Sequence, residues 1–423
     1  MQKGALPGFR DFYPEDLSLR SHIFETWRRV ATRYGFEEYD GPPLESLELY
    51  TAKSGDEIVG QLYNFTDKGD RAVALRPEMT PTLARMVAAR ANGLKKPIRW
   101  FSLPQLFRYE RQQRGRLREH FQLNCDLIGE PGPLADAEII ALAVDVMRAF
   151  GLGPADVRVR LSDRRVLTAL LRSAGIAEGQ LGQVFQALDR WGKLDQAGIT
   201  ELLAKVGLDG ATIARVHAIA GIRSLPDLLE AMGENAPMAE PFRDTIAALE
   251  AMGLGEFLDL DLTIVRGLAY YTGTVFELFD AGRTLRAICG GGRYDDLTSA
   301  VGGVQLAAVG FGMGDVVLGE LLKEKGLLPE YAGSIDVFVA AEGEGMEGAL
   351  LLTHRLREAG IRAEYALGGQ TLSKQQDIAK ARNARLLVTL GATEAQVRDL
   401  RTRTQASHSA PQLMAAIKMA LAE

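Results

Sequence analysis

Residues 99–128 read RWFSLPQLFRYERQQRGRLREHFQLNCDLI, and their pattern is the clearest indication of the fold class. Apolar and aromatic residues mark its two ends, Arg99–Tyr109 and His120–Ile128, and a polar loop that contains Gly115 separates them. Two such runs around a polar, glycine-containing connection are typical of an antiparallel hairpin with a long loop. The stretch therefore predicts a core built on antiparallel strands.

Sequence on either side of the hairpin adds helices and further strands. Apolar positions between Asp16 and Tyr34 recur near a 3.6-residue period, which predicts an amphipathic helix before Gly41-Pro42-Pro43. The other elements that we expect are a helix from Pro81 to about Ala91 and strands at Ala72–Leu75, Leu260–Val265 and Thr274–Phe279. The predicted fold class is α+β, a mixed sheet centred on antiparallel strands and packed against helices.

Changes in sequence character predict the domain organisation. Between about residues 163 and 255, Ala- and Leu-rich helical stretches replace strand patterns, which indicates a helical insertion in a first domain of residues 1–325. A linker follows at residues 326–333, where Pro329 and two glycines interrupt the pattern. In residues 334–423 strands alternate with helices, the pattern of a separate α/β domain. Its expected elements are strands at Ile335–Ala340, Ile361–Leu367 and Arg385–Leu390 and helices at Met346–Ala359, Leu372–Ala384 and Pro411–Leu421.

Composition excludes several classes of protein. Apolar runs such as Ile139–Val144 are far shorter than the roughly 20 residues that span a bilayer, and no apolar signal segment opens the chain, so we expect a cytoplasmic protein without a membrane segment. Cys125 and Cys289 form neither a disulfide nor a zinc pattern and are expected to be buried. The five histidines have no ligand spacing, so we expect no bound transition metal. The net charge of −6 argues against a protein that coats nucleic acid, although local basic patches remain compatible with RNA binding.

Polar residues gather around the predicted hairpin. Phe107-Arg108-Tyr109-Glu110 ends one strand, and Arg116, Arg118, His120 and Gln122 lie on the loop and the returning strand. Two facing strands can direct an arginine, a glutamate and an amide into one cleft, which suits phosphate together with a polar ligand. Arg and Glu also pair across ordinary hairpins, and an arginine-rich run is often only a solvated surface.

Three further stretches have competing interpretations. Residues 265–272, VRGLAYYT, suggest a binding loop or a structural pair of tyrosines. Glu78 and Thr80 lie at a strand-to-helix turn, where Thr80 could bind a ligand or cap the helix. Gly290-Gly291-Gly292 does not have the spacing of a dinucleotide-binding motif, and no βαβ pattern surrounds it, so that interpretation is rejected.

Taken in order, these motifs resemble the histidine–tRNA ligase family of class II aminoacyl-tRNA synthetases over essentially the whole chain. The C-terminal part, with Leu367–Gln375, is similar to the anticodon-binding domain of that family. The stretches that carry the resemblance are Pro7–Pro14, Leu75–Glu78, Phe107–Arg111, Gly115–Arg116, Arg118–Glu119, Arg266–Leu268, Tyr270–Tyr271, Gly291–Asp295 and Gly310–Gly314. The resemblance implies that ATP, with Mg²⁺, activates L-histidine to histidyl-adenylate and that the histidyl group passes to tRNA(His). It also implies a homodimer.

The same resemblance implies roles for individual residues. Arg108 and Arg266 would be catalytic and would bind the α-phosphate from opposite sides, and the expected ATP-binding residues are Arg108, Glu110, His120 and Arg266. Glu78, Thr80 and Gln122 would receive the α-amino group of histidine, and Asp126 and Tyr271 would recognise its imidazole in a pocket shaped by Tyr270. Arg111 and Gln113 would approach the acceptor end of the tRNA.

Four positions depart from the usual family pattern. Val317 stands where an arginine commonly stacks on adenine, and His120 where a phenylalanine does; Asp126 replaces a glutamate and Ala269 an aspartate. One alternative is therefore a non-catalytic, histidine-sensing paralogue of the kind that regulates ATP phosphoribosyltransferase. Another is an RNA-binding module without activity. Arg108, Arg266 and a complete C-terminal domain favour the ligase over the paralogue, and Arg266 beside Tyr270 and Tyr271 favours it over the RNA-binding module.

Overall fold

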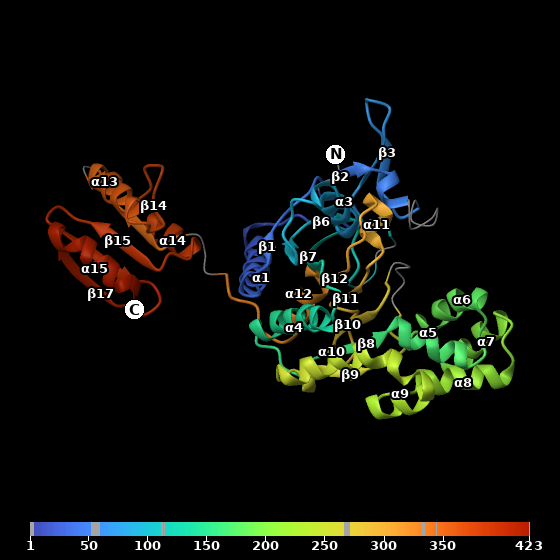
Figure 1. The fold of residues 1–423 in the computed structure, drawn as a ribbon. Coiled ribbons are helices and arrows are strands. Elements are labelled where there is room, and N and C mark those ends of the chain that lie inside the picture. Colours follow the sequence, from blue (N-terminus) through green and yellow to red (C-terminus); the bar gives the residue numbers. More distant parts are fainter. Residues whose placement is uncertain are drawn as a thin grey trace. The chain divides into compact units, whose positions relative to one another are not determined.

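The computed structural model describes residues 4–51, 60–110, 113, 115–265, 271–331, 335–343 and 345–422 (Figure 1). The chain forms two compact units, Met1–Pro329 and Glu330–Glu423. Within the described ranges, every helix is too short or too polar to cross a membrane.

A large, mainly antiparallel sheet forms the centre of the first unit. Its strand order is β1-β5-β7-β12-β11-β10-β8-β9, and β6 pairs with β7. Only the pairs β1–β5 and β8–β9 are parallel, so the predicted antiparallel core is confirmed. The strands are β1 (Glu37–Glu38), β5 (Ile98–Ser102), β6 (Gln105–Phe107), β7 (Glu119–Ile128), β8 (Val157–Asp163), β9 (Leu258–Leu260), β10 (Thr274–Asp280), β11 (Cys289–Arg293) and β12 (Ala308–Gly314). A smaller sheet joins β2 (Leu44–Ser46), β4 (Ala72–Leu75) and β3 (Asn64–Thr66).

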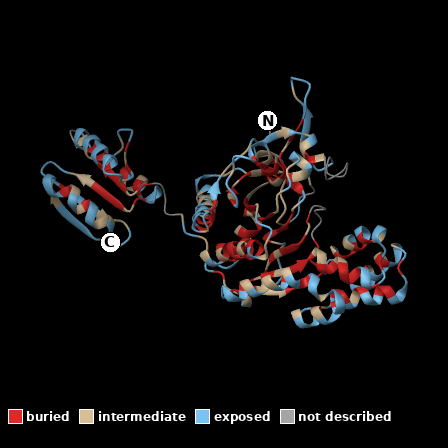
Figure 2. Cartoon of the chain, viewed as in Figure 1, coloured by how far each residue is buried: buried red, intermediate tan, exposed pale blue. Residues whose placement is uncertain are grey.

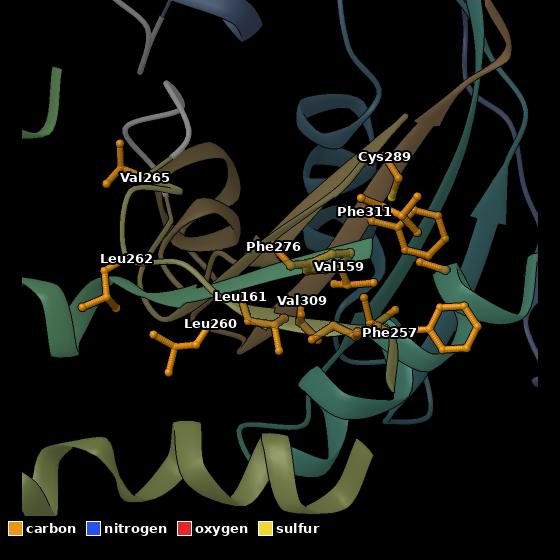
Figure 3. Packing of buried hydrophobic residues seen from close by; sticks show 14 of the residues in the cluster. Val159, Leu161, Phe257, Leu260, Leu262, Val265, Phe276, Cys289, Val309 and Phe311 are labelled. Carbon is orange, nitrogen blue, oxygen red and sulfur yellow. The ribbon is translucent and has the colours of Figure 1, made fainter. Parts of the chain in front are cut away.

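Side chains that alternate along the strands of the large sheet pack into two different cores, one on each face. On one face, Leu123, Cys125 and Leu127 of β7 belong to the main core together with α1 (Pro14–Arg33), α4 (Pro133–Ala149) and α12 (Asp315–Glu324). Figure 3 shows part of this cluster, including Phe276, Val309 and Phe311. A smaller core is formed with α3 (Thr80–Arg90) and α11 (Leu297–Gly302). Because successive strand residues point to opposite faces, Gln122, Asn124 and Asp126 lie on the face of β7 away from the main core.

A run of helices separates β8 from its neighbour β9. Asp163, Asp195, Asp209 and Ser224 each cap a helix by accepting a hydrogen bond from a backbone N–H in its first turn. The inner faces of these helices are buried and their outer faces are exposed (Figure 2). The helices are α5 (Arg164–Ser173), α6 (Glu178–Leu188), α7 (Gln196–Lys205), α8 (Gly210–Ala220), α9 (Leu225–Met232) and α10 (Glu240–Ala251), with 3-10 helices η1 (Gly233–Ala239) and η2 (Gly255–Phe257).

Two predicted strands differ from the structure. The run Arg99–Tyr109 forms two strands, β5 and β6, because Pro104 between them has no backbone N–H to donate. The predicted strand Leu260–Val265 ends at Leu260. There the Asp261 carboxylate accepts hydrogen bonds from the Thr263 backbone nitrogen at 3.1 Å and hydroxyl at 2.6 Å, which turns the chain.

The second unit is a five-stranded sheet in the order β14-β13-β15-β16-β17. The first three strands are parallel, as the alternating pattern predicts, whereas β16 and β17 form an antiparallel extension that the sequence interpretation missed. Only Ala395 and Val397 are buried in β16, which leaves little apolar pattern to detect. The elements are β13 (Val337–Ala340), α13 (Gly345–Glu358), β14 (Ala363–Tyr365), α14 (Leu372–Ala381), β15 (Leu386–Leu390), β16 (Glu394–Asp399), β17 (Gln405–Ser409) and α15 (Ala410–Ala422).

Candidate active site

Glycines on the central strands leave room for the polar side chains of β7. A Cβ atom on Gly310 would lie 2.1 Å from Oδ1 of Asp126, and one on Gly312 would lie 2.6 Å from Cδ of Gln122. On β11, a Cβ on Gly292 would lie 2.9 Å from Cδ1 of Tyr271. A larger residue at any of the three glycines would overlap with the side chain of Asp126, Gln122 or Tyr271. The glycines therefore form a flat surface, here called the glycine floor, on which these three side chains lie. The Gly290–Gly292 run is thus part of a central strand, in agreement with the rejection of a dinucleotide loop.

Asp126 is the most perturbed acid of this floor. Its side chain is 3% exposed, and burial raises the pKa of Asp126 from 3.8 to about 7, although a hydrogen bond from the Tyr294 hydroxyl acts in the opposite direction. A carboxyl group with this pKa can accept a proton or give one up near neutral pH. The sequence interpretation assigned no role to Tyr294, because its contact with Asp126 spans 168 residues of the chain.

Glu78 lies on the turn between β4 and α3, next to a contact with the hairpin. Its side chain is 8% exposed, and the preceding carbonyl, that of Pro77, accepts a hydrogen bond from Nε of Arg108 at 3.0 Å. Arg76 fixes the same segment by donating to Asp40 at 2.9 Å and to the Gln105 carbonyl at 3.0 Å. Thr80 is the first residue of α3, whose N-cap is Met79, so the interpretation of Thr80 as a plain helix cap is wrong.

An ion-pair network joins three distant segments beside β7. Arg10 donates to Glu119 at 2.7 Å and to Asp315 at 2.9 Å, and the two carboxylates are almost fully buried. Asp315 also accepts a hydrogen bond from the backbone nitrogen of Phe121 at 2.9 Å. The network fixes the start of β7 relative to α12. The sequence interpretation did not identify Arg10 or Asp315 as site residues.

His120 lies close to several cations. Burial, followed by the positive charges of Arg108, Arg10 and Arg116, lowers the pKa of His120 from 6.5 to about 3. Its imidazole is therefore neutral at physiological pH. Glu110 forms an ion pair with Arg116 on the same loop, while Arg118 lies over the Tyr109 ring at 4.3 Å from its centroid.

Of the remaining predicted site residues, some lie within the described part of the chain and others lie outside it. Tyr271 is 7% exposed and packs in the smaller core, and Gln113 is exposed on the loop between β6 and β7. Arg111, Arg266 and Tyr270 lie outside the described residues. In the part of the chain that is described, no three His, Cys, Asp or Glu side chains are arranged to hold a metal ion.

The antiparallel sheet, its glycine floor and the arginines beside it define a class II aminoacyl-tRNA synthetase. A family model described as Histidyl-tRNA synthetase matches residues 8–314, and one described as Anticodon binding domain matches residues 336–419. The chain belongs to the histidyl-tRNA synthetase family, whose members use ATP, histidine and tRNA(His).

Similar proteins agree with this family. The histidine–tRNA ligase of Opitutus terrae is 45% identical over 98% of this chain and 98% of its own. The chloroplastic/mitochondrial histidine–tRNA ligase of Arabidopsis thaliana is 41% identical over 92% of this chain and 80% of its own. The crystal structure of histidyl-tRNA synthetase from Nostoc sp. PCC 7120 has a TM-score of 0.84 and 26% identity and covers 99% of both chains. None of these three favours the regulatory alternative.

Proposed function

We propose that this chain is a histidine–tRNA ligase, which activates L-histidine with ATP and transfers the histidyl group to tRNA(His). The observation that carries the proposal is the buried Asp126 carboxyl group on the glycine floor, on the same strand face as Gln122. An apolar amino acid would cover this buried acid without donating a hydrogen bond to it, which is costly, whereas an imidazole N–H can donate to it.

Histidine is held at both ends in this proposal. Asp126 and Tyr271 recognise the two imidazole nitrogens, and Tyr270 shapes the pocket. The α-amino group is an ammonium with three N–H donors, which matches the acceptors of Glu78, Thr80 and Gln122. Support comes from the burial of Glu78 and from the contact that holds its segment against Arg108.

Activation follows from positioning and charge. The histidine carboxylate attacks the α-phosphate of ATP, the bond to the β-phosphate breaks, and pyrophosphate leaves. Arg108 and Arg266 bind the α-phosphate from opposite sides and stabilise its developing charge, while Glu110 and the neutral ring of His120 contact the nucleotide. When bound, Mg²⁺ would neutralise charge on the phosphates; it usually takes most of its ligands from phosphates and water, which fits the finding that no three described His, Cys, Asp or Glu side chains are arranged to hold a metal ion.

Transfer of the histidyl group to the tRNA requires contacts with two parts of the tRNA, the acceptor end and the anticodon. Arg111 and Gln113 approach the acceptor end, where the terminal ribose takes the histidyl group, and the domain of residues 334–423, joined through the linker at 326–333, binds the anticodon. The match of that part of the chain to an anticodon-binding domain supports this division. We also propose a homodimer.

Histidine-dependent exchange of pyrophosphate into ATP tests this function. We expect exchange with histidine and with none of the other amino acids, and a loss of about 1,000-fold or more in an Arg108→Ala variant. An Arg172→Ala variant is the matched control, since its exposed pair with Glu178 lies among the helices after β8. Histidine binding without any exchange in the wild-type protein would contradict the ligase and support the histidine-sensing regulator.

A further inference from the structure

Three elements meet at Gly115, on the loop between β6 and β7. A Cβ atom on Gly115 would lie 3.2 Å from Cγ2 of Val317, on α12, and 3.7 Å from Cδ of Arg286, on the loop between β10 and β11. Gly115 has a φ of +71°, which favours glycine and lets the loop turn at this contact. The aliphatic part of Arg286 therefore lies close to the site that Val317 leaves without charge.

Arg286 adds a cation to a cluster that already has a positive excess. Its guanidinium donates to the amide oxygen of Gln113, and among the described residues it forms no ion pair with a carboxylate. Burial first, then the charges of Arg286 and Arg108, lower the pKa of Arg116, whereas Glu110 is the acid that pairs with Arg116. Two guanidinium groups that repel Arg116, which itself pairs with a single carboxylate, leave a positive excess that favours an anion with several charges.

The loop that carries Arg286 is rigidly built. The buried carboxylate of Asp280 accepts hydrogen bonds from the Thr284 nitrogen at 2.9 Å, the Thr284 hydroxyl at 3.1 Å and the Leu285 nitrogen at 3.0 Å. These bonds hold the backbone next to Arg286, so little backbone conformational entropy is lost when Arg286 binds a ligand. By contrast, Arg283 on the same loop lies 3.7 Å from a carboxylate oxygen of Asp261.

We propose that Arg286 binds the β- and γ-phosphates of ATP, the part of the nucleotide that leaves as pyrophosphate. This inference rests on the proposed function. A guanidinium group forms forked, charge-assisted hydrogen bonds with phosphate oxygens, and polyphosphate relieves the repulsion among Arg108, Arg116 and Arg286. The neutral adenine ring would not relieve it.

The test compares Arg286→Gln and Arg286→Lys with wild-type protein, with Arg283→Gln as the control on the same loop. In pyrophosphate exchange, we expect Arg286→Gln to raise the KM values for ATP and for pyrophosphate about 10-fold or more, as for the loss of a hydrogen bond between charged groups. Arg286→Lys should recover a large part of this loss because it keeps the charge. The KM for histidine should stay within about twofold in each variant.

Binding of a stable sulfamoyl analogue of histidyl-adenylate separates the two ends of the nucleotide, because it contains adenine but no pyrophosphate. Unchanged analogue binding in Arg286→Gln, together with raised KM values for ATP and pyrophosphate, supports the proposal. Weakened analogue binding with an unchanged KM for pyrophosphate would place Arg286 at the adenine and overturn it, as would unchanged KM values throughout. Absence of exchange in the wild-type protein would instead contradict the proposed function itself.

Discussion

The hydroxyl of Tyr294 donates a hydrogen bond to Oδ1 of Asp126 on the floor of the site. Tyr294 is 3% exposed, so this bond is shielded from water. It favours the charged carboxylate, because it lowers a pKa that burial raises. In the proposed histidine site, Tyr294 therefore serves as a positioning residue that acts through Asp126.

A Tyr294→Phe substitution should weaken histidine binding. Without the hydroxyl, the pKa of Asp126 rises further and less of the group is ionised near neutral pH, so we expect the KM for histidine to rise about 10-fold at about pH 7. The increase should shrink at higher pH, where Asp126 ionises again. Pyrophosphate exchange at several pH values measures both effects, and Tyr13→Phe, at a tyrosine that is 70% exposed, is the control. A KM that is independent of the hydroxyl would exclude this role.

An Asp126→Asn substitution should stabilise the unliganded fold more at high pH than at low pH. The folded-state pKa of Asp126 is raised from 3.8 to about 7. The folded protein therefore holds a proton that the unfolded chain releases, and the free energy of unfolding falls as the pH rises between these values. Asparagine removes this cost, so the midpoint of thermal unfolding should exceed that of wild type by more at about pH 8 than at about pH 5.

The same variant tests recognition. Asp126→Asn puts a neutral amide in place of the carboxylate, so histidine-dependent exchange should fall by about 100-fold or more. Stability gained together with activity lost is the expected result for a buried acid that serves a ligand. A lower unfolding midpoint at about pH 8 would show that the ionised carboxylate stabilises the fold instead.

Local pattern was enough to predict much of the fold, but not the contacts between distant segments. The apolar runs around Gly115 predict the strands β6 and β7, and the alternation along β7 is clear in the sequence because each of its faces has a different environment. The strands that pair with β7 could not be predicted in this way. Gly310 lies opposite Asp126 only because β12 pairs with β7 in one register, and no local property of either segment determines that register.

In the candidate site, too, some residues could be predicted from the sequence, whereas residues defined by contacts between distant segments could not. Glu78, Gln122 and Asp126 could be named from the family resemblance, and the structure buries two of them, Glu78 and Asp126. Arg10 and Tyr294 could not be assigned roles, since their partners are distant in sequence: 305 residues separate Arg10 from Asp315. Nor could Arg286 be singled out, because an arginine in a polar loop is usually a solvated surface residue.

An Arg10→Met substitution should destabilise the first unit. It leaves the carboxylates of Glu119 and Asp315, whose side chains are 1% and 4% exposed, without their cation. Breaking a buried ion pair in this way typically costs about 3 kcal/mol, whereas loss of an exposed pair costs less than about 1 kcal/mol. Urea unfolding should therefore show a clear fall in midpoint for Arg10→Met and almost none for Arg172→Met. Equal midpoints in the two variants would mean that the Arg10 network contributes little.

A Gly310→Ala substitution tests the glycine floor directly. The added methyl group would lie 2.1 Å from Oδ1 of Asp126 and 2.7 Å from the carbonyl oxygen of Cys125. Such an overlap in a closely packed sheet typically costs about 1–3 kcal/mol, and it would displace Asp126 from the position where we expect the imidazole to bind. Gly314→Ala is the matched control, because it lies on the same strand and a Cβ there would meet nothing within 4 Å.

We expect the KM for histidine in pyrophosphate exchange to rise about 10-fold or more in Gly310→Ala, with the KM for ATP almost unchanged, and both to stay near wild type in Gly314→Ala. The contrast between the two substrates matters more than the loss of activity, because general unfolding would lower the amount of active enzyme without changing either KM. If both KM values stayed constant in Gly310→Ala, histidine would have to bind away from Asp126, and the floor of β11 and β12 would only support the sheet.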